Sequence, residues 1–542
     1  MALLLSVYYM LSGAAQAHQL EGCMEYIIKY TGDILSLGYP TELLDAQFAI
    51  MELEARSAVR LLDYQQVSSY EPARNLSCLM ADRSLEAACI PPVQRKNGLG
   101  LTGEGVLIGF VDSGLDLNHP EFLGGDGTSR VAALWDMTAE GTPPKGFRRG
   151  AAYSKEEIAA GLVSSADVTG HGTAVAAVAA GRSGVAPGAA IAAVKLATAR
   201  TTDVMRAVKY LLDQAEERGM PCVVNISYGT NCGSHQGQTL FESYIDQSAQ
   251  RGRSAVVCAA GNEGSGAHHF RGRLVEGGTV DAEFTVSTRR EQIYLSLWKN
   301  FADEAALELI LPNGQSTGML TEGTRFLRFG SIRVSVFYGV PTHYSASQEA
   351  MILLDAPAGE LDGLWKLRCH GKRVSDGRFD VWLPTVEEVS DRTAFLQPEP
   401  DLTITLPATA LYPISVGGFR PETETVSPFS GRGDQDCAGR VLLDLTAPAE
   451  AVRSAKAGGG YDVFTGTSMA APFVSGAAAL MMEWGVVQGN DLFLYGQRVK
   501  AFLCKGALRS PFLAYPNPQW GYGRLNLCGT MNELVSHVER GL

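Results

Sequence analysis

Apolar residues form short continuous runs that alternate with amphipathic stretches from about Gly105 onward. Between the runs lie helical patterns such as TDVMRAVKYLLDQAEERG and FESYIDQSAQRG. Uninterrupted apolar runs of this length are typical of strands that are buried on both faces of a parallel sheet. Strands that alternate with helices predict an α/β domain built on such a sheet. The runs are GVLIGFVD (105–112), AAIAAVKL (189–196), CVVNISYG (222–229) and SAVVCAAGN (254–262).

The pattern changes between residues 276 and 397. Segments such as QIYLSLWKN, SIRVSVFYG and GRFDVWLP alternate polar and apolar positions and are separated by turn residues, which predicts an antiparallel β-sandwich. The α/β pattern then resumes with ISVGGF and LLDLTAPA and closes in a helix of small residues, TSMAAPFVSGAAALMM. Because neither flank completes the α/β domain alone, we interpret the sandwich as an insertion.

A smaller unit precedes the α/β domain. Strand-like EYIIKY, FAIMELE and VSSYEPA and the helical pattern SAVRLLDYQQ predict an α+β module. Residues 1–17 have the apolar stretch and the small-x-small end of a signal peptide but lack its basic start, and Met24 is an alternative start of the natural chain. The expected division is 1–23 (leader or mis-assigned start), 24–95 (N-terminal module), 96–275 (α/β domain, first part), 276–397 (inserted sandwich) and 398–542 (α/β domain, second part).

Composition excludes several classes of partner. The chain has 45 basic and 58 acidic side chains and a formal net charge of −13, which disfavours binding to nucleic acid or to anionic lipid. No run reaches about 18 apolar residues, so no transmembrane anchor is expected. The ten cysteines show no CxxC or zinc spacing and are interpreted as buried thiols. Neither metal nor cofactor is predicted, since the acid-rich loops present no recognisable calcium-ligand set, for example in Gly433-Asp434-Gln435-Asp436.

Four polar residues stand where the predicted strands end or the next helices begin. Asp112 and Asn262 end two apolar runs, and His171 and Ser468 stand at the starts of two helices of small residues. Catalytic groups of open α/β sheets gather at the carboxyl ends of the strands. Taken singly, Asp112 and Ser468 are equally well explained as helix caps, and His171 as a loop residue.

The four local sequences together carry a resemblance. VDSGLDLNHPEF, GHGTAVAAVAAG, AAGNEG and GTSMAAPFVSG resemble, in this order, the signature sites of the subtilisin-like (S8) serine peptidases. The order Asp, His, Ser is the one for which subtilisin is the standard example. The resemblance implies a serine endopeptidase with a subtilisin-like three-layer α/β fold, in which the N-terminal α+β module is a propeptide.

The resemblance also implies a role for each residue. Ser468 is the nucleophile, His171 the general base, and Asp112 the carboxylate that orients the imidazole. Asn262 and the Ser468 backbone N–H would bind the oxyanion. His119, seven residues after Asp112, is a rival base to which the resemblance gives a structural role. Two further segments resemble the parts of the family that form the walls of the S1 pocket and the strand that pairs with the peptide substrate. Their residues are Ser227, Tyr228, Gly229, Ala259, Ala260 and Gly261.

The KYTGDI strand of the short propeptide and a jelly-roll insert at this place resemble the clostridial Csp germination proteases. This implies a self-processing zymogen that binds its own propeptide, is cut near residues 84–88, and activates a cortex-lytic zymogen. The protein would then be spore-associated, or secreted if residues 1–17 are a signal peptide. The alternative is a latent or pseudoprotease-like binding protein that its propeptide holds inhibited. The insert serves either as a rigid clamp or as a docking surface.

Overall fold

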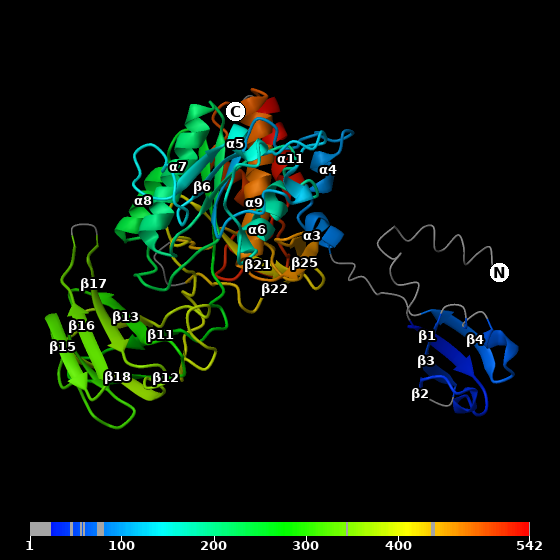
Figure 1. Ribbon diagram of the computed structural model, residues 1–542. Helices are drawn as coiled ribbons and strands as arrows, with labels where there is room; N and C mark the ends of the chain where they lie inside the picture. The colour runs from blue at the N-terminus through cyan, green and yellow to red at the C-terminus, as the bar shows by residue number, and fades with distance from the viewer. Residues whose placement is uncertain are drawn as a thin grey trace. The chain divides into compact units, whose positions relative to one another are not determined.

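The computed structural model describes residues 23–43, 47–54, 57, 60–72, 81–342, 345–434 and 440–540. The predicted leader therefore lies almost wholly outside the described residues. The chain divides into two compact units, Met1–Leu79 and Met80–Leu542, and each is described by itself (Figure 1).

The first unit contains a four-stranded antiparallel sheet in the order β2-β3-β1-β4. Alternate residues of β1, Tyr26, Ile28 and Tyr30, are buried against Met51 and Leu53 of β3, so one face of the sheet carries the core. Over residues 57–66, where the sequence predicts a helix, Ser57 is helical, residues 58 and 59 lie outside the described residues, and Leu61–Asp63 form a 3-10 turn. The strands are β1 (Cys23–Tyr30), β2 (Thr41–Leu43), β3 (Phe48–Glu54) and β4 (Val67–Pro72).

A nine-stranded sheet forms the centre of the second unit, in the order β22-β21-β10-β9-β5-β8-β6-β7, with β23 paired to β21. All neighbours run parallel except the outer strands β7 and β22, as the continuous apolar runs predict. The strands are β5 (Leu107–Asp112), β6 (Val131–Asp136), β7 (Ala151–Ser154), β8 (Ala190–Lys195), β9 (Cys222–Ile226), β10 (Ser254–Ala259), β21 (Ile414–Arg420), β22 (Thr425–Val426) and β23 (Leu445–Pro448).

Helices cover both faces of this sheet, which makes three layers. On one face α6 (His171–Ala180) packs against α9 (Thr467–Met482), and both helices are rich in alanine and nearly fully buried. The other face is covered by α7 (Thr201–Glu217) and α8 (Leu240–Ala249). The segment Thr467–Val487 is long and apolar enough to span a membrane, yet 94% of its most apolar window is buried inside the protein. It is therefore the central helix of the core.

The insertion is an antiparallel sandwich, as the alternating segments predict. Its two sheets have the orders β11-β19-β13-β17-β16-β15 and β14-β18-β12-β20, and they enclose one apolar core (Figure 1). The strands are β11 (His269–Arg273), β12 (Thr279–Val286), β13 (Gln292–Asn300), β14 (Glu304–Ile310), β15 (Gly323–Phe329), β16 (Ile332–Tyr338), β17 (Ser347–Asp355), β18 (Gly363–Arg373), β19 (Arg378–Trp382) and β20 (Ala394–Phe395).

A buried polar network joins the sandwich to the α/β domain. Asp380 of β19 accepts hydrogen bonds from His269 Nε2 at 2.9 Å and from Arg271 Nε at 2.8 Å. Arg271 and Arg378 also bind Asp434, which lies in the α/β domain, at 2.8 and 2.6 Å. The Trp382 ring stacks on His269 at a centroid distance of 4.7 Å. The insert is thus held to the α/β domain by paired charges.

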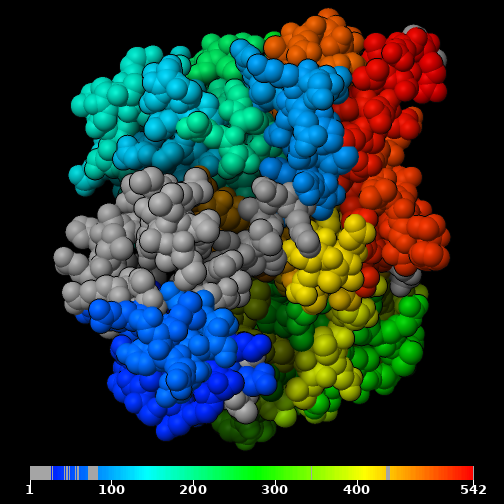
Figure 2. Space-filling view, turned by 90° about the vertical axis from the view of Figure 1, so that its right-hand side faces the viewer, coloured from blue at the N-terminus to red at the C-terminus, as the bar shows by residue number. Residues whose placement is uncertain are grey.

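Two short helices after the first unit belong to the α/β core. These are α3 (Ala81–Ala87) and α4 (Pro91–Gln94). Val93 of α4 and the adjacent residues Ala88 and Ile90 are buried in the core. Figure 2 shows this lighter blue segment against the red C-terminal part of the chain. By packing, the first unit therefore ends at residue 79, whereas the sequence analysis extended the N-terminal module to residue 95.

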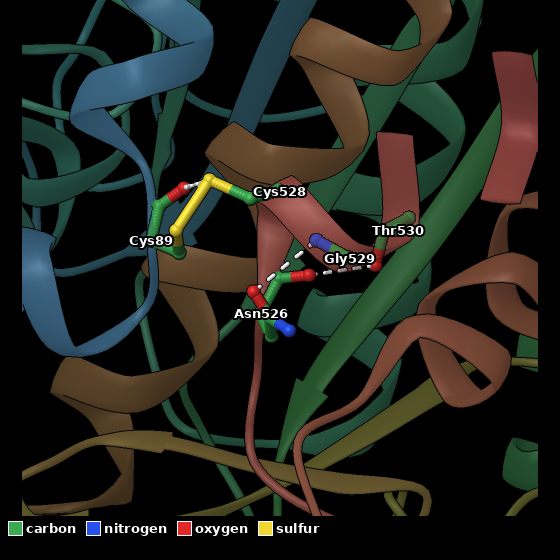
Figure 3. Close-up of a disulfide and its surroundings, with 5 residues drawn as sticks. All are labelled: Cys89, Asn526, Cys528, Gly529 and Thr530. Atoms are coloured by element: carbon green, nitrogen blue, oxygen red, sulfur yellow. Dashed lines mark hydrogen bonds between the residues drawn. A yellow bond between two sulfur atoms is a disulfide. The ribbon is translucent and has the colours of Figure 1, made fainter. Parts of the chain in front are cut away.

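Cys89 and Cys528 form a disulfide with a Cα–Cα distance of 5.6 Å (Figure 3). The bond joins the chain after α3 to α11 (Leu527–Glu539), which also contacts α4. The interpretation of all cysteines as thiols was therefore wrong for this pair, because a sequence separation of 439 residues leaves no local pattern. Cys222, Cys232, Cys258, Cys369 and Cys504 are free thiols.

Candidate active site

Asp112 and His171 are brought together where β5 ends and α6 begins. His171 Nδ1 lies 2.7 Å from Asp112 Oδ1, which also accepts a hydrogen bond from the Ser113 N–H at 2.8 Å. Asp112 is 1% exposed, whereas the His171 side chain is 35% exposed. A buried carboxylate that holds one ring nitrogen of a partly open imidazole leaves the other nitrogen available to a substrate.

Charge near the imidazole favours its protonated form. Asp112 is the main cause that raises the pKa of His171, and it outweighs the burial that would lower the pKa. Asp167 and Glu387 add smaller contributions in the same direction. A base with this environment binds the proton that it removes more tightly than a free imidazole does.

Asp167 supports the loop that precedes His171, and the sequence analysis missed it. Its carboxylate accepts hydrogen bonds from the Thr173 N–H at 2.8 Å, the Ser113 hydroxyl at 2.8 Å and the Gly170 N–H at 3.0 Å. Burial alone would raise the pKa of Asp167, but these hydrogen bonds lower it. The one signal in the sequence is its position four residues before His171, inside a polar loop.

Asn262 is connected to the start of the buried helix α9. Its Oδ1 accepts hydrogen bonds from the Thr467 N–H at 3.0 Å and the Thr467 hydroxyl at 3.1 Å. Gly466, directly before the helix, adopts φ 147°, which favours glycine, and Ser468 is the second residue of α9. The N-terminus of α9, which is the positive end of the helix dipole, therefore carries Ser468 and is bound by the side-chain amide of Asn262.

Two residues just beyond the end of β9 contact the proposed catalytic residues: Ser227 contacts Ser468, and Tyr228 contacts His171. The Ser468 hydroxyl lies 3.5 Å from the Ser227 carbonyl oxygen, and the Tyr228 ring stands edge-on to the His171 ring at 6.3 Å. Consecutive residues thus contact Ser468 on one side and His171 on the other. Burial raises the pKa of the Tyr228 hydroxyl, which stays neutral.

The remaining predicted substrate-binding residues lie at the ends of β9 and β10. Ala259 and Ala260 are buried, and Ala260 donates its N–H to Val416 and accepts a hydrogen bond from the Thr405 N–H, both at 2.9 Å. A Cβ on Gly229 or Gly261 would lie 2.2 or 2.5 Å from a Thr405 side-chain atom. Close packing therefore explains both glycines, and a role of all these residues in substrate binding remains a prediction.

A residue of the inserted sandwich also contacts the candidate active site. Asn262 Nδ2 donates a hydrogen bond to Glu387 Oε1 at 2.8 Å, and Glu387 follows the last long strand of the sandwich. The sequence analysis missed Glu387, because 125 residues separate it from Asn262.

His119 is engaged elsewhere. It is 2% exposed, its Nε2 lies 2.8 Å from the Gly460 carbonyl oxygen, and its Nδ1 accepts the Glu121 N–H at 3.2 Å. Both ring nitrogens thus contact the backbone, as expected of a structural histidine.

Within the described ranges, no group of three or more His, Cys, Asp or Glu side chains has a geometry that could hold a metal ion. The acid-rich loop of residues 433–436 falls partly outside the described residues, since these stop at residue 434 and resume at 440.

Comparison with known proteins identifies the family. The sequence model of the Subtilase family matches residues 103–283 and 392–523, which together make up more than half of the chain. The chain belongs to this family. The two matched segments flank most of the sandwich. Membership confirms the predicted subtilisin-like α/β domain, and the two antiparallel sheets between the segments agree with the predicted inserted sandwich.

Individual relatives agree with this assignment. The chain is similar to subtilisin-like protease 9 of Arthroderma benhamiae, 26% identical over 212 residues that cover 38% of this chain and 43% of that protein. It is 37% identical over 95 residues to subtilisin E of Bacillus subtilis, covering 16% and 23%. The chain thus spans less than half the length of these curated relatives.

A solved structure covers far more of the chain. The CspB protease of Clostridium perfringens is 36% identical, has a TM-score of 0.76, and matches 84% of this chain and 98% of that chain. The likeness thus extends beyond the parts shared with ordinary subtilisins, and it agrees with the predicted resemblance to the Csp branch.

Proposed function

We propose that this member of the subtilase family is a serine endopeptidase. The observation that carries the proposal is the 2.7 Å contact between His171 Nδ1 and Asp112 Oδ1, at the sheet edge where α9 presents Ser468. Family membership supports a protein or peptide as the substrate.

The arrangement supports a mechanism in which Ser468 Oγ attacks the peptide carbonyl carbon and His171 Nε2 accepts the hydroxyl proton. Asp112 holds the ring so that Nε2 is the free nitrogen, and its charge stabilises the imidazolium that forms. Asn262 Nδ2 and the Ser468 N–H would donate to the oxyanion. His171 then gives the proton to the leaving amine, and water repeats the sequence to release the acyl group.

In the described structure Ser468 Oγ is directed to Ser227 and not to His171. Catalytic hydrogen bonds of this kind are often long in the absence of substrate and shorten in the Michaelis complex.

We also propose that the protein is made as a zymogen that cuts itself and holds its own propeptide. Residues 84–88, where the sequence predicts the cut, lie in α3 or its end, and Ser84 and Ala88 are buried. A protease binds its substrate as an extended strand, so these residues would have to unfold first. A cut between the end of β4 at Pro72 and the start of α3 at Ala81 would break no described strand or helix, and we propose the cut there.

The likeness to the CspB protease supports the narrower proposal that the physiological substrate is another zymogen, a cortex-lytic hydrolase activated in spore germination. This proposal rests on resemblance, and the site itself carries only the peptidase chemistry.

Labelling with a fluorophosphonate tests the peptidase proposal, because the reagent reacts with an activated serine. Wild-type protein should be labelled at Ser468 and appear by mass spectrometry as two fragments cut between residues 72 and 81. Ser468→Ala should abolish labelling and self-cleavage while the far-UV circular dichroism stays unchanged. Ser536→Ala, a matched change of an exposed serine in α11, should alter neither.

Wild-type protein that is folded, unlabelled and uncut would refute the proposal. Cleavage followed by retention of the N-terminal fragment, with no turnover of any peptide, would instead favour the latent binding protein.

A further inference from the structure

Glu387 is an exposed carboxylate of the insert that lies within the proposed catalytic centre. Its Oε1 accepts a hydrogen bond from Asn262 Nδ2 at 2.8 Å. Nδ2 is the atom that the proposed mechanism needs as donor to the oxyanion. In the free protein the insert therefore occupies one N–H of that donor with a negative charge.

The turn that carries Glu387 is built into the protein and is not a loose loop. Thr385 accepts backbone hydrogen bonds from Glu388 at 2.8 Å and Val389 at 3.1 Å, which closes the turn. The Val386 N–H donates to Glu263 Oε1 at 2.8 Å. Since Glu263 directly follows Asn262 in the chain, neighbouring residues of one segment bind neighbouring residues of the turn.

Glu263 is itself fixed from two sides. It is 2% exposed, and its Oε2 accepts a hydrogen bond from Asn231 Nδ2 at 3.0 Å and lies 2.6 Å from His268 Nδ1. Asn231 also donates to the Leu383 carbonyl oxygen at 3.1 Å, four residues before Glu387. The position of the Glu387 backbone is thus determined by buried contacts with the α/β domain.

No lysine or arginine of the described ranges forms an ion pair with Glu387. Its charge also reaches the catalytic side, since Glu387 is among the groups that raise the pKa of His171. A carboxylate at hydrogen-bond distance from an oxyanion donor repels the second negative charge that forms there during acyl transfer. The contact seen in the free protein therefore opposes catalysis unless it opens.

We propose that Glu387 is a restraining residue: its carboxylate holds the amide of Asn262 in the empty site and must release it before the oxyanion can form. The sandwich thereby takes part in the chemistry of the catalytic centre and sets its resting activity. This inference rests on the proposed serine-peptidase function.

The test is the rate of labelling by a neutral fluorophosphonate and of hydrolysis of a neutral peptide ester by the full-length protein. Loss of one oxyanion donor lowers kcat about 10²–10³-fold in subtilisin, a member of this family. Recovery of part of that effect in Glu387→Ala should raise both rates at least about tenfold, in kcat and not in KM. Glu387→Gln, which keeps an acceptor but removes the charge, should give a smaller increase.

Two controls make the result specific. Asp391→Asn removes one exposed carboxylate four residues away and should leave both rates within about twofold of wild type. In an Asn262→Ala background Glu387→Ala should give no gain, because the donor that it releases is absent.

Rates in Glu387→Ala equal to or below those of wild type, with labelling still dependent on Ser468, would overturn this inference alone. A gain that persists in the Asn262→Ala background would overturn it as well, since Glu387 would then act elsewhere. Absence of Ser468 labelling in every variant would refute the peptidase function together with the inference, whereas labelling of wild type and faster labelling of Glu387→Ala would support both.

Discussion

Gly172, the residue after His171, is tightly packed in the proposed catalytic centre. A Cβ built there would lie 2.2 Å from the Gly114 carbonyl oxygen and 3.2 Å from Asp112 Oδ1. Real Cβ atoms essentially never approach a neighbour closer than 3.0 Å, so Gly172→Ala requires a separation of at least 0.8 Å between α6 and the turn after β5. Both segments carry a member of the Asp112–His171 pair.

A misplacement of about 1 Å in a catalytic group costs about 10²-fold in rate, and overpacking of a buried position costs about 1–3 kcal/mol. We therefore expect Gly172→Ala to fold, with a lowered melting temperature, and to lose about 10²-fold in kcat on a peptide ester. Gly252→Ala is the matched control, because nothing lies within 4 Å of its added Cβ. A Gly172→Ala protein with kcat within threefold of wild type at full folding would refute the reasoning.

Three further predictions concern charge and cross-linking. Asp112→Asn should lower kcat about 10⁴-fold and, because Asp112 is the main cause that raises the pKa of His171, should move the acidic limb of the pH profile of kcat/KM to lower pH; an unmoved limb would contradict this. Cys89→Ser with Cys528→Ser should lower the free energy of unfolding by about 2–4 kcal/mol, seen as a lower urea midpoint, and an unchanged midpoint would contradict it. Asp380→Asn should cost about 3 kcal/mol in the same assay, because two arginines of the insert lose one of their two buried carboxylate partners; a loss below about 1 kcal/mol would show that the network contributes little.

The layered part of the fold could be predicted because its signals are local. Apolar runs of six to eight residues, ended by Asp112 or Asn262, indicate buried parallel strands, and alternating polarity indicates the sandwich. The pattern of apolar and polar positions also shows where the strands and helices end, and the predicted site residues stand at these ends. For that reason the sequence predicts that Asp112 and His171 lie at the same edge of the sheet.

Contacts between distant segments could not be predicted. Glu387 lies on the insert, and nothing in its surroundings distinguishes it from the adjacent Glu388, which instead accepts a hydrogen bond from the Thr385 N–H within the turn at 3.2 Å. Residues 81–94 resemble the tail of the N-terminal module in sequence, because their burial depends on distant parts of the chain: α3 contacts β24 (Val452–Ala455), and α4 contacts α11. Only the packing shows to which of the two compact units such a segment belongs.

The link between Cys89 and Cys528 gives the catalytic unit the covalent connectivity of a ring. The chain between Cys89 and Cys528 closes on itself, and the sandwich is a part of this closed loop that leaves the α/β domain and returns to it. Local unfolding that starts before Cys89 or after Cys528 would stop at the bond. A new pair of ends opened in an exposed turn, such as the one at Gly252, should thus give a circular permutant whose original ends are already joined.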